Sequence, residues 1–290
     1  MSASYNDVLS WWRSQKKNTI DDYKLLIDNF QVVFATNTNQ IEGVPVSYNT
    51  TRAVFEGANI SNYTGSLDSL FLVRNQKFAF EFMLKSLIQK EPITLDFIRK
   101  LHKILMYGSY DEARWKRGER PGTFKVHDYC VGMLEVGSFP DEVEGDLESL
   151  LEELEDTSDN KLLLKAAYFH AVFETIHPFA DGNGRVGRTL LNYYLMLHDY
   201  PPLVIYDEDK NTYYMALEVF NRTENLSGMV SFIEEQTIKT WCNHVSPNLS
   251  KLEWCKRNAP APLRDLSDDE IVSLMSDAYE RAVSMGKVRD

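Results

Sequence analysis

Residues 161–176, KLLLKAAYFHAVFETI, restrict the fold of this chain more than any other stretch. Their apolar side chains cover most sides of a helix, and such a helix must lie at the centre of a packed protein. Elsewhere apolar positions recur at three- and four-residue steps, and stretches that alternate as strands do are few. We therefore predict an all-α fold, a helical bundle built around this segment.

The N-terminal pattern over residues 20–41 predicts one helix or a pair of helices that ends near Glu42, because Gly43 follows. A short helix is expected within residues 44–65. The other predicted helices share the same spacing and cover residues 66–87, 95–106, 140–154, 185–197, 211–221, 226–241 and a last stretch from 267. Beyond Pro247 we expect a proline-spaced linker.

Residues 108–140 differ from this helical pattern. Turn signals at Gly118 and Pro121-Gly122 precede a β-prone run from Phe124 to Val131, which predicts one small hairpin. An exposed strand edge in a helical protein can pair with an extended peptide.

The formal net charge of −12 argues against a general nucleic-acid binder, which needs a surplus of Lys and Arg on some face. Any anion site must therefore be local. No run of 18 apolar residues appears, and the N-terminus lacks the pattern of a secretory signal. We expect a cytoplasmic protein with neither nucleic acid nor membrane as a partner.

Directly after the apolar helix comes the segment 177–188, HPFADGNGRVGR. Pro178 breaks the first helix, and a second helix is expected to begin near Asn183. Gly182 and Gly184 let the connecting backbone curl closely, so that free amides at the new helix start point into the loop. Unpaired N–H groups and the helix dipole make such a loop an anion cradle.

Charged side chains surround this predicted cradle. Arg185 and Arg188 are three residues apart on one helix face, and guanidinium groups suit phosphate oxygens. Asp181 offers a hard oxygen ligand for Mg²⁺. His177 supplies a base near neutral pH. Together they describe nucleotidyl or phosphoryl transfer to an alcohol.

Two alternatives remain for this segment. One is a helix–turn–helix without chemistry, and the other is a His-x-x-x-Asp metal site, which leaves both arginines unexplained. A Walker loop is excluded because the chain contains no GxxxxGK[ST].

The segment resembles the signature HPFxDGNGRxxR of Fic proteins, and the similarity extends over about residues 95–245. This resemblance implies a protein adenylyltransferase that moves AMP from ATP to a Ser, Thr or Tyr hydroxyl and releases pyrophosphate. His177 would activate the hydroxyl, Asp181 would bind Mg²⁺, and Arg185 and Arg188 would hold the β- and γ-phosphates. The expected anion cradle consists of Gly182, Asn183 and Gly184.

Gly184 favours AMP transfer, because family members that transfer phosphate have lysine there. Another nucleotide donor, such as CDP-choline, and a catalytically quiet interaction module remain alternatives. The expected partners are ATP and a protein target with an exposed hydroxyl, including the chain itself, and the oligomeric state is left open.

Residues 38–43, TNQIEG, match the family pattern [ST]xxxE[GN] of an inhibitory helix. By this resemblance Glu42 would pair with Arg188 and keep the ATP γ-phosphate from seating. The alternative is a simple helix end, although a glutamate in a last turn opposes the helix dipole. The same glutamate could also position water for the reverse removal of AMP.

Two further groups of residues follow from the resemblance. Gly122 to Gly132 is similar to the target-docking flap, with docking residues Lys125, Val126, His127, Asp128 and Tyr129, where Lys125 replaces the usual arginine. Alternatively, this segment only covers the core. Tyr213, Tyr214 and Asn221 follow the motif at the distance where relatives contact adenine, whereas aromatic residues at helical spacing are often core.

The expected parts of the chain are a helical region over residues 1–94 with the inhibitory helix, a Fic core over 95–245, and a linker with a helix over 246–290. His170 is expected to be a core histidine.

Overall fold

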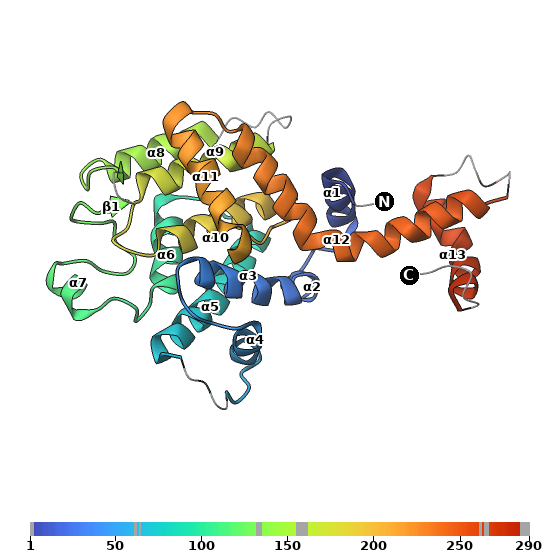
Figure 1. Ribbon diagram of the computed structural model, residues 1–290, viewed down its shortest axis with the longest axis horizontal. Helices are drawn as coiled ribbons and strands as arrows, with labels where there is room; N and C mark the ends of the chain where they lie inside the picture. Colours follow the sequence, from blue (N-terminus) through green and yellow to red (C-terminus); the bar gives the residue numbers. More distant parts are fainter. Residues whose placement is uncertain are drawn as a thin grey trace.

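The computed structural model describes residues 3–60, 63, 65–131, 135–154, 162–260, 263 and 267–284. Within these ranges almost all of the regular secondary structure is helical, which confirms the all-α prediction (Figure 1). The helices in chain order are α1 (Tyr5–Ser14), α2 (Ile20–Leu26), α3 (Asp28–Ile41), α4 (Tyr48–Glu56), α5 (Leu67–Gln89), α6 (Leu95–Leu105), α7 (Glu112–Lys116), α8 (Val143–Leu154), α9 (Leu162–Ile176), α10 (Asn183–Leu197), the 3₁₀ turn η2 (Asp207–Asp209), α11 (Lys210–Thr223), α12 (Ser227–Asn258) and α13 (Asp268–Ser284).

The helices α9 and α10 form the centre of the molecule. Nearly every side chain of α10 is buried, and the helix packs against α9, α3, α5 and α6 (Figure 1). Phe169 and Phe173 of α9 are fully buried, as its all-round apolar sequence predicts. The loop that joins α9 to α10 is therefore held at both ends by the best-packed helices.

Of the two options expected before Glu42, one helix or a pair, the structure has the pair α2 and α3. α3 packs against α4, α5 and α10, so its C-terminal turn lies beside the start of α10. Thr38 is 1% exposed, which shows that the last turns of α3 are inside the protein.

The hairpin is shorter than expected. β1 (Cys130–Val131) pairs antiparallel with β2 (Glu135–Val136), and residues 124–129 are outside the strands. The Lys125 N–H donates to the Pro178 carbonyl, and the Val126 N–H donates to the Glu119 carboxylate. These two amides therefore donate to other segments of the protein and form no hydrogen bonds between strands.

Two helices depart from the sequence expectation. The short α7 was not predicted, and it begins where the Asp111 side chain accepts from the Arg114 N–H at 2.8 Å. The helix expected over 226–241 continues as α12 to Asn258, so the expected linker after residue 247 begins inside a helix. Proline inside a helix costs about 3 kcal/mol. Both α1 and α13 pack against α12.

Across the described part of the chain, we find no helix with both the length and the apolar character needed to cross a membrane.

Candidate active site

The segment 177–182 changes the chain direction between two buried helices. α9 ends at Ile176, and His177 takes a left-handed conformation with φ 52° while its N–H bonds the Phe173 carbonyl at 3.1 Å. Gly182 has φ 85° and precedes α10. This backbone conformation is one that residues with a side chain rarely adopt, and a Cβ there would also lie 2.5 Å from Met106 Sδ, so the position favours glycine. The predicted helix stop and restart are confirmed.

The N-terminus of α10 has the geometry of an anion-binding site. No side chain caps its first amides, and Arg185 and Arg188 lie in its first turns, 6% and 2% exposed. The Nε and Nη1 atoms of Arg185 are buried and have no hydrogen-bond partner. Buried donors without an acceptor are costly, and an anionic ligand would satisfy them.

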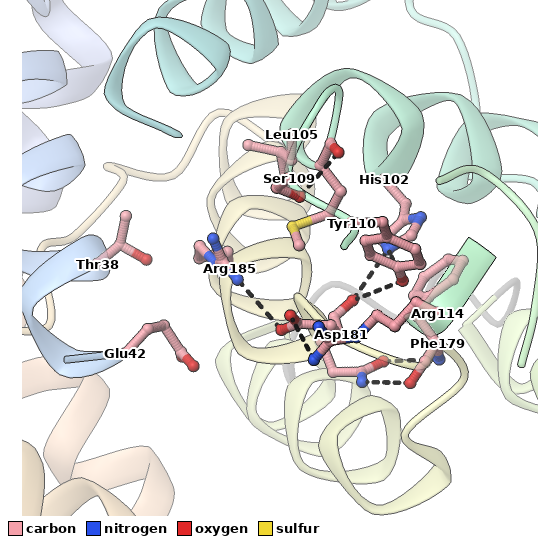
Figure 2. A network of polar contacts seen from close by, with 12 residues as sticks. Thr38, Glu42, His102, Leu105, Ser109, Tyr110, Arg114, Phe179, Asp181 and Arg185 are labelled. Atoms are coloured by element: carbon pink, nitrogen blue, oxygen red, sulfur yellow. Dashed lines mark hydrogen bonds and ion pairs between the residues drawn. The ribbon is translucent and has the colours of Figure 1, made fainter. Parts of the chain in front are cut away.

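Asp181 lies beside these donors with its carboxylate one-third exposed. It pairs with Arg185 at 3.3 Å and with Arg114 of α7 at 3.2 Å (Figure 2). In the described residues no group of three His, Cys, Asp or Glu side chains could hold a metal alone. A single carboxylate fits Mg²⁺, which takes its other ligands from phosphates and water.

His177 is half-buried, and its Nδ1 atom has no hydrogen bond of ordinary geometry. Burial, followed by the positive charge of Lys125, lowers the pKa of His177 to about 4. The imidazole is therefore neutral at pH 7, as a proton acceptor must be.

Glu42 and Arg188 form an ion pair across the site, with Arg188 Nη2 donating to Glu42 Oε1 at 2.6 Å. Arg188 Nε also donates to Thr38 Oγ1 at 2.9 Å, and Nη2 donates to the Thr38 carbonyl at 3.2 Å. Burial would raise the pKa of Glu42, but the charge and hydrogen bond of Arg188 hold it below its usual value. Glu42 is therefore an anion at neutral pH.

This anion lies against the first turn of α10. A Cβ at Gly184 would collide with Oε1 of Glu42 and lie 2.8 Å from Arg188 Nη1. Figure 2 shows Thr38 on α3 and Glu42 directly after it, both facing the loop that carries Asp181. The structure thus brings His177, Asp181, Gly184, both arginines and Glu42 into one site.

Asn183 has a different contact from the one expected. Its side chain accepts from the Phe179 N–H at 2.9 Å and donates to the Phe179 carbonyl at 2.8 Å. Both polar atoms of the amide are thus used inside the loop. Asn183 can shape the cradle, and its backbone amide belongs to the start of α10.

The predicted adenine contacts lie on α11. Tyr214 is 46% exposed, and Asn221 accepts from Thr175 Oγ1 at 2.7 Å near the end of α9. These positions are seven residues apart and share one helix face. Tyr213 is core, and its hydroxyl lies 2.9 Å from Nε2 of the buried His170, as expected for a core histidine.

The flap residues separate into two groups. Val126 is 50% exposed, and His127 and Asp128 are exposed too, while Tyr129 donates to Glu119 Oε1 at 3.0 Å. Lys125 is 2% exposed, with a buried Nζ that has no hydrogen-bond partner. The structure therefore turns Lys125 inward, away from the surface that a docked target would contact.

Three further residues of the site were not predicted: Arg114, His102 and Glu174. The Glu174 carboxylate lies against Gly187, and burial raises its pKa to about 7. Arg114 of α7 forms an ion pair with Asp181, but no sequence motif links these two distant positions. Glu174 stands three residues before His177, and an acidic residue in an otherwise apolar helix end was the available signal.

Comparison with known proteins agrees with this arrangement. The Fic/DOC family profile matches residues 92–195. "Protein adenylyltransferase Fic" of Drosophila willistoni is 29% identical over 252 residues, which are 83% of this chain and 48% of that protein. The protein of the same name from Drosophila persimilis is 32% identical over 206 residues, or 69% of this chain and 38% of the relative.

Solved structures show the same fold. A Fic domain containing signaling protein from Bacteroides thetaiotaomicron aligns with TM-score 0.70 and 26% identity, covering 84% of this chain and 96% of that one. Fic-1 from C. elegans aligns with TM-score 0.67 and 24% identity, covering 84% of this chain and 69% of that one. The chain belongs to the Fic family. It spans less than half the length of the two Drosophila relatives.

Proposed function

We propose that this chain is a protein adenylyltransferase that transfers AMP from ATP to a Ser, Thr or Tyr hydroxyl of a protein. The observation that carries the proposal is the α10 N-terminus, where uncapped amides and the unpartnered donors of Arg185 lie beside the neutral His177. Relatives named protein adenylyltransferase support the same reaction.

In the proposed reaction the α10 amides and Arg185 bind the phosphates of ATP. The His177 Nδ1 atom is buried near the Glu174 carbonyl, which leaves Nε2 to accept the proton of the target hydroxyl. The hydroxyl oxygen forms a bond to the α-phosphorus, the bond to the β-phosphate oxygen breaks, and pyrophosphate leaves. Asp181 would hold Mg²⁺, which supplies positive charge to the phosphates when it is bound.

We further propose that Glu42 inhibits this reaction in the resting protein. Its carboxylate occupies the region of Gly184 and takes the Arg188 guanidinium that would hold the γ-phosphate. The negative charge of the Glu42 carboxylate beside Gly184 also repels the negatively charged triphosphate of ATP. The cytoplasmic location, the three-part division of the chain and the docking role of the exposed flap residues also remain proposals.

Intact-mass spectrometry tests the proposed activity. The Glu42→Gly protein is incubated with Mg²⁺ and ATP, and we expect it to gain the mass of AMP by self-modification or to add it to a partner in a lysate. The Glu42→Gly/His177→Ala protein, which retains the cradle, should gain none. GTP, UTP and CDP-choline in parallel reactions test the donor. Binding of ATP without any transfer would favour the interaction-module alternative.

A further inference from the structure

His102 of α6 lies at the centre of the contacts behind the candidate active site. It is fully buried, and its ring stacks on Phe179 with centroids 3.7 Å apart and parallel planes. Phe179 stands in the loop between His177 and Asp181. The proposed reaction uses neither side chain directly.

Both ring nitrogens of His102 have backbone partners. The Gly122 N–H donates to Nδ1 at 2.8 Å, so Nδ1 carries no proton. The proton must then be on Nε2, which lies 3.0 Å from the Asp181 carbonyl and donates to it (Figure 2). The Gly122 N–H and the Asp181 carbonyl together fix this neutral tautomer of the ring.

These two partners belong to different parts of the site. Asp181 carries the carboxylate that faces Arg185 and Arg114. Gly122 is the first residue of the flap segment that runs from Gly122 to Gly132. One imidazole therefore hydrogen-bonds both the backbone of the loop that joins α9 to α10 and the first residue of the flap. The two ties are separate hydrogen bonds on separate atoms.

We propose that His102 is a positioning residue with two roles. Its Nε2 holds the Asp181 backbone in place for nucleotide binding, and its Nδ1 holds the start of the flap in place. The nucleotide part of this inference rests on the proposed function. Substitutions can remove the two bonds one at a time. The amide oxygen of asparagine reaches about as far as Nδ1, and the amide nitrogen of glutamine reaches about as far as Nε2.

The test compares His102→Asn and His102→Gln, both in the Glu42→Gly background. We expect His102→Asn, which keeps the bond to Gly122, to weaken binding of Mg²⁺ with a non-hydrolysable ATP analogue about tenfold, in the range for residues that orient a metal ligand. His102→Gln, which keeps the bond to Asp181, should bind the analogue within about threefold of its parent but show faster hydrogen exchange at the Gly122 amide.

Equal losses of affinity and equal exchange rates in the two variants would overturn the inference, because a packing residue predicts no such split. If the Glu42→Gly parent binds no nucleotide, the proposed function fails, and the exchange of the Gly122 amide alone decides the role of His102. In the parent protein, nitrogen-15 NMR should find the His102 proton on Nε2. A proton on Nδ1 would contradict the assignment.

Discussion

The Glu42 carboxylate and the Arg188 guanidinium lie 2.6 Å apart, although 146 residues separate them in the chain. Thr38, one turn earlier on α3, accepts from the same guanidinium. Arg188 is 2% exposed, so this ion pair is shielded on the arginine side. In the account proposed here, the pair keeps the second arginine of the site from ATP.

Glu42→Gly should bind Mg²⁺ and ATP at least about tenfold more tightly than the wild type, equivalent to about 1.4 kcal/mol. The same change leaves Arg188 buried without its partner. The free energy of unfolding should fall by about 2 kcal/mol, less than for a fully buried pair because the Glu42 side chain is 28% exposed. Thermal unfolding with and without ATP measures both effects, and an unchanged response to ATP would contradict them.

Thr38→Val should release part of the inhibition, because it removes the acceptor of Arg188 Nε and keeps Glu42 in place. We expect a smaller rise in AMP transfer than in Glu42→Gly, and a stability loss of about 1 kcal/mol. Thr36→Val is the matched control, since the buried Thr36 hydroxyl donates to the Val32 carbonyl and does not contact Arg188. Equal activation by both valine variants would point to general loosening of α3.

Lys125→Met should raise the pKa of His177 above its value of about 4, because the lost positive charge opposed protonation of the imidazole. Burial remains in the variant, so the pKa should stay below the ordinary value of 6.5. Lys125→Arg keeps the charge and should leave it unchanged. NMR titration of His177 provides the measurement, and a lower pKa in Lys125→Met would be the contrary result.

The free energy of unfolding should decrease as pH falls from 6.5 towards 4. His102 and His170 have pKa values of about 3 in the folded protein and His177 about 4, against an ordinary 6.5. In this window the unfolded chain binds more protons, so acid favours unfolding. Glu174, raised to about 7, acts in the opposite direction from pH 7 to 4.5 and offsets one histidine.

Urea titrations at pH 7 and pH 5 measure this effect. His170→Phe removes one buried titrating group, so its stability should change less between the two pH values, by at most about 1.4 kcal/mol per pH unit. A wild-type protein that is more stable at pH 5 than at pH 7 would contradict the assignment of neutral buried histidines.

The sequence predicts those parts of the fold and site that depend on neighbours in the chain or on a family motif. The end of α9 and the start of α10 follow from Pro178 and Gly182. The pair between Glu42 and Arg188 was expected from the family pattern and is present in the structure. Other contacts between distant segments match no sequence motif and could not be predicted. His102 reaches Asp181 across 79 residues, and the Lys125 side chain is buried where the Lys125 amide donates to the Pro178 carbonyl.

The proposed chemistry is tested most directly by the origin of the transferred group. Glu42→Gly protein is incubated with Mg²⁺ and ATP labelled at either the α- or the γ-phosphorus. The account predicts protein-bound label from α-labelled ATP only, and none when His177→Ala is added to the same chain. Protein-bound label from γ-labelled ATP, or none from either in a chain that binds ATP, would contradict it.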